Sequence, residues 1–424
     1  MSDLLVKNAR FKDNKVQDIL ILDKIIAEIG NVRDLIDIPT IDAKGYFVTT
    51  PFVDSHFHLD ATLSYGIPRV NQSGTLLEGI KLWGELKPNL TADALKKRAR
   101  KLCQWAIARG TLSIRSHVDI SDPSLLAVEA MLDIKSEYKS WLDLQLVAFP
   151  QDGLIRAGSK TNLSKALELG VEVVGGIPHF ERTMEEGTES IKYLCELAAS
   201  KGLQVDMHCD ESDDPMSRHI ETLTKETVRL GLEGRVAGSH LTSMHSMDNY
   251  YVSKLLPLMS EANVSVIANP LINITLQGRH DSYPKRRGLT RIPEQLRAGL
   301  TVAFGHDCVM DPWYPLGSQD MLDVAHMALH VAQMTGAAQM RECFNAVTEY
   351  PAKILGLDGY GLKKGCKGDL VILQCMDDIE ALRLRPARLF VVREGSVLSS
   401  TEEVISNLNL SGKKSSTDFI FSKP

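Results

Sequence analysis

Eight short apolar runs, each ending in a polar residue, recur along the middle of the chain and restrict the fold more than any other feature. They are TTPFVDSHFH (49–58), LSIRSHVD (112–119), LDLQLVAFPQ (142–151), VEVVGGIPHF (171–180), LQVDMHCDE (203–211), GRVAGSHL (234–241), VSVIANP (264–270) and TVAFGHD (301–307). From the second run onward they follow one another at roughly thirty to forty residues, the span of one β-α unit in a TIM barrel.

Amphipathic segments lie between the runs. The segments 92–110, 188–202 and 220–234 place apolar residues at helical spacing, and each ends on glycine. Strands that alternate with helices predict a parallel sheet, and eight such units predict a closed barrel. We therefore expect an α/β protein of the (β/α)8 type.

The two ends of the chain have a different sequence pattern. Residues 1–50 and the segment from 361 contain short β-type runs such as LLVKNARF, GDLVILQC and RLFVVREGSVL. We expect them to pair into one small β-sandwich domain, with the barrel at 51–360 and the second part of the sandwich at 361–424. The tail after about 405 is polar, and we expect it to be loose or to lie on a neighbour.

Charge and cysteine content exclude several classes of protein. A net charge of -6 gives no basis for binding nucleic acid or an anionic membrane, and no apolar stretch is long enough to span a bilayer. The N-terminus lacks the pattern of a signal peptide. Seven scattered cysteines without a C-x-x-C favour a reducing cytoplasm over a disulfide framework.

A barrel of this type carries its active site where the strands end. The residues that close the eight runs are mostly histidines, and they are expected on one rim: His56, His58, His117, Gln151, His179, His208, His240, Asn269 and Asp307. Packing explains so many imidazoles poorly, because burying them unpaired is costly. Three imidazoles and a carboxylate suit one divalent cation with a water as its remaining ligand.

The residues that fit such a site are His56, His58, His208 and Asp307. The fourth run offers no lysine for a second, bridged metal, so we expect one ion. Glu211 lies three residues beyond His208 and can carry a proton, with a pKa that burial raises and the metal lowers. His240 is expected to help deprotonate the water whose pKa the metal lowers.

Several longer motifs resemble the mononuclear deaminase branch of the amidohydrolase superfamily, and within it the bacterial cytosine deaminases. These motifs are HFHLD, NQSGTLLEGI, RSHVDISD, LQLVAFPQDG, GGIPHFE, DMHCDESDD, SHLTSMHS, ANPLINITLQGRHDSYPKRRG and FGHDCVMDPWYPLG, and the resemblance covers about residues 45–400. It implies hydrolytic deamination of a free pyrimidine base, Zn²⁺ or Fe²⁺ as the metal, and assembly into a homo-oligomer.

By position, the resemblance assigns the metal ligands named above, Glu211 as proton shuttle and His240 beside the hydrolytic water. It also assigns Gln151 as the amide that recognises the base, which suits a side chain that both donates and accepts. Leu76, Phe149 and Trp313 are expected as apolar walls of the substrate pocket.

One position departs from the family pattern. Cytosine deaminases carry a second aspartate after the metal aspartate, near C5 of the bound ring, and this chain has Cys308 there. A carboxylate disfavours a methyl group at C5, whereas a small polarizable thiol leaves room for it. We therefore expect 5-methylcytosine to be a good substrate besides cytosine.

Three alternatives are weighed against this interpretation. The barrel could act on another ring, such as isocytosine, creatinine, a triazine or a cyclic amide, or it could be a scaffold without chemistry. The cytidine-deaminase fold needs H-x-E with P-C-x-x-C. This chain has H-x-x-E and no C-x-x-C, which argues against that fold.

Overall fold

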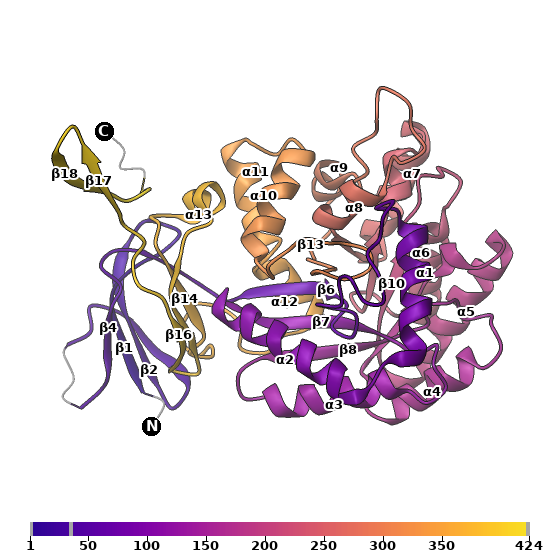
Figure 1. Ribbon diagram of the computed structural model, residues 1–424, viewed down its shortest axis with the longest axis horizontal. Coiled ribbons are helices and arrows are strands. Elements are labelled where there is room, and N and C mark those ends of the chain that lie inside the picture. Colours follow the sequence, from indigo (N-terminus) through magenta and orange to yellow (C-terminus); the bar gives the residue numbers. More distant parts are fainter. Residues whose placement is uncertain (1–2, 34–36, 421–424) are drawn as a thin grey trace.

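The larger domain of the computed structural model, which describes residues 3–33 and 37–420, is a barrel of eight parallel strands (Figure 1). The strands follow one another in chain order: β6 (Phe52–Phe57), β7 (Thr111–Asp119), β8 (Asp143–Phe149), β9 (Val173–Gly176), β10 (Gln204–Cys209), β11 (Val236–His240), β12 (Ser265–Ala268) and β13 (Val302–Phe304). A parallel bridge between Phe57 and Asp307 joins the first strand to the end of the last. The predicted TIM-barrel fold is confirmed. Seven of the eight strands lie within one of the apolar runs, and β7 begins one residue before its run.

Helices cover the outside of the barrel, and the three predicted from periodicity are present as α2 (Ala92–Ala108), α5 (Met184–Lys201) and α6 (His219–Leu230). Helix α5 begins where the Thr183 side chain accepts from the Glu186 amide and ends at Gly202, with φ of 69°. The others are α1 (Leu76–Leu86), α3 (Leu126–Tyr138), α4 (Ser159–Glu168), α7 (Asn249–Glu261), α8 (Pro270–Leu276), α9 (Ile292–Arg297), α10 (Met321–Val331), α11 (Ala337–Asn345), α12 (Glu349–Leu355) and α13 (Asp378–Leu384).

The two chain ends form one β domain, as predicted. Its sheet has the order β16-β15-β14-β5-β1-β2-β3, with β4 beside β1, so that β14 from the C-terminal part pairs with β5 from the N-terminal part. The strands are β1 (Leu4–Arg10), β2 (Val16–Leu22), β3 (Ile25–Gly30), β4 (Thr40–Asp42), β5 (Phe47–Thr49), β14 (Leu370–Leu373), β15 (Arg388–Arg393) and β16 (Ser396–Ser400). The expected boundaries at 50 and 360 lie in the β5–β6 and α12–β14 connections.

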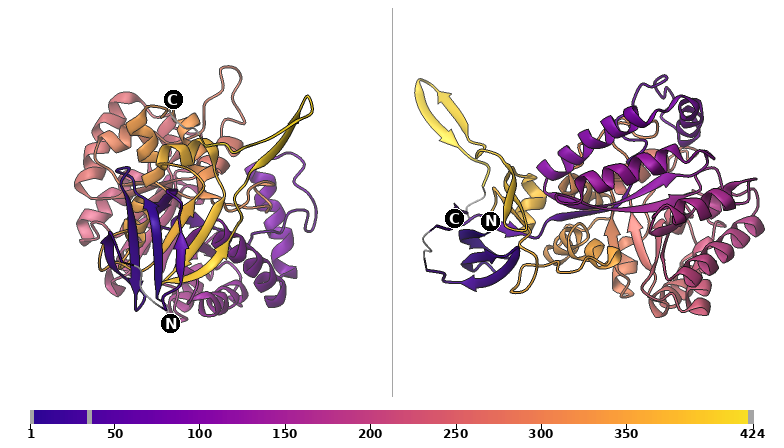
Figure 2. Two further views of the ribbon diagram at one scale, coloured as in Figure 1. Left: turned by 90° about the vertical axis from the view of Figure 1, so that its left-hand side faces the viewer. Right: turned by 90° about the horizontal axis from the view of Figure 1, so that it is seen from below.

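The C-terminal tail forms regular structure and is not loose, and the alternative expectation, that it lies on a neighbour, stays a prediction. Strands β17 (Ser406–Leu410) and β18 (Lys413–Thr417) form an antiparallel hairpin that extends away from the β domain (Figures 1 and 2). Ser411 and Gly412 at its tip both have positive φ, which suits a tight hairpin turn. The hairpin is largely exposed, and the expected homo-oligomer stays a prediction.

The described part of the chain contains no helix long and apolar enough to cross a membrane. All seven cysteines are free and buried. The barrel strands are mostly buried, and in β7 every residue is buried. In a barrel of this type the active site lies at the carboxyl ends of the strands.

Candidate active site

The four predicted metal ligands come together at the carboxyl ends of the barrel strands. His58 Nε2 lies 3.0 Å from His208 Nε2 and 3.4 Å from Asp307 Oδ1, and His56 Nε2 lies 3.6 Å from the same oxygen. His56 is on β6, His58 follows that strand, His208 is on β10 and Asp307 follows β13. All four side chains are buried.

These side chains fit a divalent cation. His56 Nε2 and His208 Nδ1 are buried without a hydrogen-bond partner among the described residues. Burial lowers the pKa of His56 and His208 and brings that of His58 to about 3, so the imidazoles are neutral and offer lone pairs. Burial and the nearby Glu211 raise the pKa of Asp307, which a bound cation would counteract.

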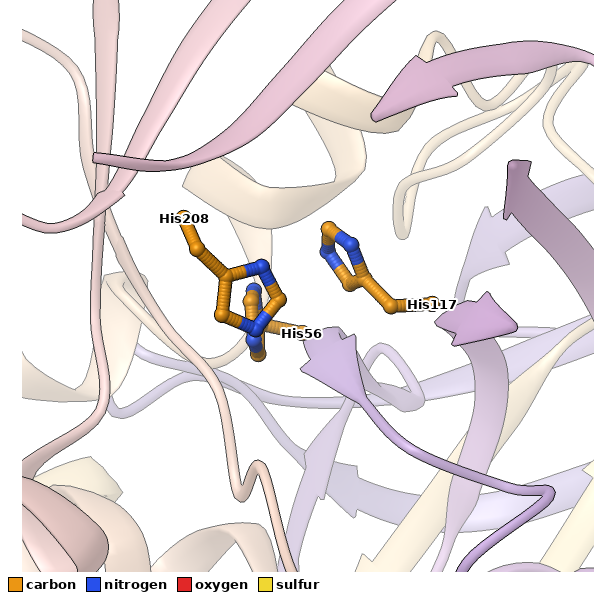
Figure 3. Close-up of side chains that lie close together, drawn as sticks. All are labelled: His56, His117 and His208. Carbon is orange, nitrogen blue, oxygen red and sulfur yellow. The ribbon is translucent and has the colours of Figure 1, made fainter. Parts of the chain in front are cut away.

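His117 at the end of β7 belongs to the same cluster, although sequence reasoning gave it no ligand role. Its ring centroid lies 4.2 Å from that of His56 and 4.6 Å from that of His208, and the three rings gather in one space (Figure 3). Ligand atoms of these three histidines lie within 4.8 Å of one another, as do those of His56, His58 and Asp307. The sequence marked His117 as a strand-end residue but not its distance from the others.

A buried polar chain supports His56 from inside the barrel. His56 Nδ1 lies 3.0 Å from Ser239 Oγ, which donates to Asp206 Oδ1 at 2.7 Å. Arg115 Nη1 donates to Asp206 Oδ2 at 2.9 Å. Partners of this kind fix the tautomer and orientation of a metal-binding imidazole. Sequence reasoning missed all three residues, because they lie within apolar runs.

The predicted proton-transfer residues are also in contact. His240 Nδ1 lies 3.2 Å from Glu211 Oε1, and His240 Nε2 lies 3.7 Å from Asp307 Oδ2. Burial raises the pKa of Glu211 to about 8 and lowers that of His240. Asn273 on α8, which was not predicted, has its Nδ2 atom 2.9 Å from His240 Nδ1 and 3.4 Å from Glu211 Oε1.

The backbone is unusual at two of these positions. His240 and Asp307 adopt the left-handed region, with φ of 72° and 69°. For residues other than glycine this costs about 1–3 kcal/mol and tends to occur at functional sites. The left-handed conformation changes the direction of the backbone at His240, where β11 ends, and at Asp307, which follows the end of β13.

A small cavity opens in front of these residues. Its lining includes the predicted Leu76, Gln151, Cys308 and Trp313, together with the unpredicted apolar residues Ile80, Ile177, Ile272 and Leu276. The predicted Phe149 is not among the lining residues; it is buried, and its ring stacks on His208 at a centroid distance of 4.1 Å. The cavity therefore combines apolar walls with a few polar groups, as small-molecule sites do.

A wider hollow lies elsewhere, where α12 approaches β5, with Lys12 and Tyr360 among its residues. Within the described chain its lining contains no histidine or cysteine. The strand-end cavity is therefore the candidate active site.

Known proteins share this architecture. The amidohydrolase family model matches residues 39–407. The structure of a 5-methylcytosine deaminase from Klebsiella pneumoniae with 5-fluorocytosine is 41% identical, covers 94% of this chain and 98% of that chain, and has a TM-score of 0.91.

Two less similar proteins are named as hydrolases of a different compound. The structure of N-isopropylammelide isopropylaminohydrolase from Burkholderia multivorans is 26% identical, covers 94% of this chain and 99% of that chain, and has a TM-score of 0.83. N-isopropylammelide isopropyl amidohydrolase from Pseudomonas sp. (strain ADP) is 27% identical over 95% of this chain and 98% of its own length. The chain belongs to the amidohydrolase family and is a hydrolase that acts on carbon–nitrogen bonds.

Proposed function

We propose that the protein deaminates free pyrimidine bases with water, converting cytosine to uracil and 5-methylcytosine to thymine, with release of ammonia. The observation that carries the proposal is the 41% identity to a solved 5-methylcytosine deaminase over 94% of this chain. The free cysteines support a cytoplasmic location.

One Zn²⁺ or Fe²⁺ ion would be held by His56, His58, His208 and Asp307. The ring of His117 lies next to these residues. An ion bound there supplies the chemistry of a water whose pKa is lowered toward neutrality. His240 is neutral and lies between Glu211 and Asp307, so it can accept or hold the proton that the water loses.

Glu211 is suited to deliver a proton to the base. With a pKa of about 8 it holds its proton at neutral pH. The water oxygen bonds to C4 of the ring as the water gives one proton to His240, and Glu211 donates its proton to N3. The Glu211 carboxylate then takes the second proton of the former water and passes it to the exocyclic amine, and the proton held by His240 later restores Glu211. The C4–N bond breaks and ammonia leaves, while Gln151 in the cavity lining orients the base through its amide.

Cys308 supports the choice of a methylated base. Its side chain lines the cavity, and its Sγ atom lies 3.6 Å from Asp307 Oδ1. Burial raises the pKa of the thiol, so no negative charge faces the ring from this position. One methyl group in an apolar pocket contributes about 1–3 kcal/mol, or about 10–200-fold in selectivity.

The test compares kcat/KM for cytosine and 5-methylcytosine in the wild type, Cys308→Asp and Cys308→Ala, each reconstituted with zinc or iron. We expect Cys308→Asp to shift selectivity toward cytosine by about 10–200-fold. Cys308→Ala keeps the space and should retain the preference for the methylated base. An equal preference for cytosine in the wild type and in Cys308→Asp would contradict the proposal.

A second candidate is the hydrolysis of an aminotriazine, favoured by the N-isopropylammelide hydrolases that match nearly the whole chain. Assays of amine release from N-isopropylammelide, isocytosine and creatinine under the same conditions distinguish this candidate. Turnover of the triazine above both pyrimidines would replace the first proposal.

A further inference from the structure

Helix α1 covers the candidate site, and a glycine lies on its inner face. Leu76 and Ile80, one turn apart on this helix, line the cavity, and Gly79 is buried beside them. A Cβ atom at Gly79 would lie 2.5 Å from Cδ1 of Trp313 and 3.0 Å from its Cγ and Nε1 atoms. The indole therefore packs directly on the helix backbone.

The glycine is not needed for backbone conformation. Gly79 lies inside a regular helix, where glycine is less favourable than alanine. The close approach of Trp313 is thus the physical reason for a glycine at this position.

Both sides of the contact are fixed. The Trp313 amide donates to Asp311 Oδ1 at 2.9 Å. Helix α1 is anchored by Trp83, whose Nε1 donates to Asp119 Oδ2 at 2.8 Å and whose ring lies 5.7 Å from that of Trp313. An added methyl group must therefore push the indole toward the cavity or lift the helix.

We propose that Gly79 is a specificity-determining residue: its missing side chain seats Trp313 against α1 and so sets the width of the slot that receives the flat ring. This inference rests on the proposed function, because the slot is assigned to a pyrimidine. Trp313 and Cys308 line the same cavity.

The test uses two alanine variants of one helix. Gly79→Ala introduces the clash, whereas Gly84→Ala is the matched control, because Gly84 is exposed on α1 and its added Cβ meets nothing within 4 Å. We expect Gly79→Ala to raise KM for 5-methylcytosine at least tenfold and to change kcat less. Gly84→Ala should leave both constants within twofold.

Melting temperature and tryptophan fluorescence test the contact without catalysis. Gly84→Ala should raise Tm by about 1–2 °C, whereas Gly79→Ala should lower Tm and shift the emission spectrum. In a Trp313→Ala background, Gly79→Ala should instead raise Tm, because the clashing ring is gone. This sign reversal separates the contact from a general defect in folding.

A Gly79→Ala variant that raises Tm like Gly84→Ala, with KM within twofold of the wild type, would overturn the inference. If the wild type released ammonia from neither pyrimidine, the proposed function would be wrong instead. The Gly79 contact would then still be decided by the melting temperatures and the emission spectrum.

Discussion

Glu211 illustrates how burial prepares a single residue for proton transfer. Its side chain is buried between Asn273 and His240, and burial raises its pKa to about 8. The carboxyl group thus remains protonated at a pH where an exposed glutamate is ionised. The raised pKa also lowers the stability of the folded protein at neutral pH, because the Glu211 carboxyl group ionises more easily in the unfolded chain.

We expect metal-free Glu211→Gln to be more stable than the metal-free wild type at high pH. Between the ordinary pKa of about 4.3 and the folded value of about 8, only the unfolded wild type loses the proton. Wild-type stability therefore falls as pH rises through this window. Urea unfolding should show equal stability near pH 4.5 and a gain of about 2–4 kcal/mol for the variant at pH 8.

Glu185→Gln, at an exposed position on α5, is the control and should change stability little at either pH. A Glu211→Gln variant that tracks the wild type at both pH values would show that the carboxyl group ionises freely in the fold. The metal-loaded variant should also release ammonia about 10²–10⁴-fold more slowly, if Glu211 carries the proton.

The predicted site residues that lie close together in the structure are those that the barrel itself brings together. His56, His208 and Asp307 end different strands, and parallel strands of a closed barrel end on one rim. Asp206 and Ser239 could not be found in this way, because their partners come from other strands of the barrel and the pairing depends on which side chains face the barrel interior. Asn273 became relevant only through the position of α8.

At the scale of one element, the connection between β10 and α6 shows how a helix start is supported from a distance. Arg218 precedes α6 and provides no side-chain cap. The Asp210 carboxylate takes this role: it accepts from the amides of His219 and Ile220 at 3.0 and 2.9 Å. It also accepts from Ser217 Oγ at 2.7 Å. Capping rules that consider only adjacent residues overlook such a cap.

We expect Asp210→Ala to destabilise the protein by about 2–4 kcal/mol, because it leaves several buried donors without their acceptor. Asp210→Asn should cost less, since it keeps an acceptor oxygen and tolerates the positive φ of 54° at this position. Urea unfolding of both variants measures the difference. In the sequence, Asp210 lies between His208 and Glu211. Asp210→Ala should therefore lower kcat as well as the stability.

Asp214→Ala provides the matched control in the same connection. Asp214 is exposed, and its side chain accepts only a local bond from the Met216 amide among the described contacts. If Asp210→Ala and Asp214→Ala unfolded at the same urea concentration, the long-range cap would contribute nothing.

At the scale of the whole molecule, ion pairs join the β domain to the barrel. Arg388 on β15 pairs with Asp320 at the start of α10, and both side chains are almost fully buried. Arg393 on the same strand donates to Asp143 Oδ1 at 2.8 Å, at the start of β8. Pairing of β14 with β5 joins the two chain ends within the β domain.

We expect Arg388→Ala to cost about 3–5 kcal/mol, because it leaves the Asp320 carboxylate buried without its main counter-charge. Adding Asp320→Asn should restore much of the loss, since the amide still caps α10 but carries no charge. Lys24→Ala, which removes an exposed pair with Glu394, is the control and should cost at most about 1 kcal/mol. Calorimetry measures the Tm of each variant. Equal Tm values for Arg388→Ala and Lys24→Ala would mean that the Arg388–Asp320 pair does not hold the two domains together. A double variant as unstable as Arg388→Ala would mean that packing by Arg388, rather than its charge, makes the connection.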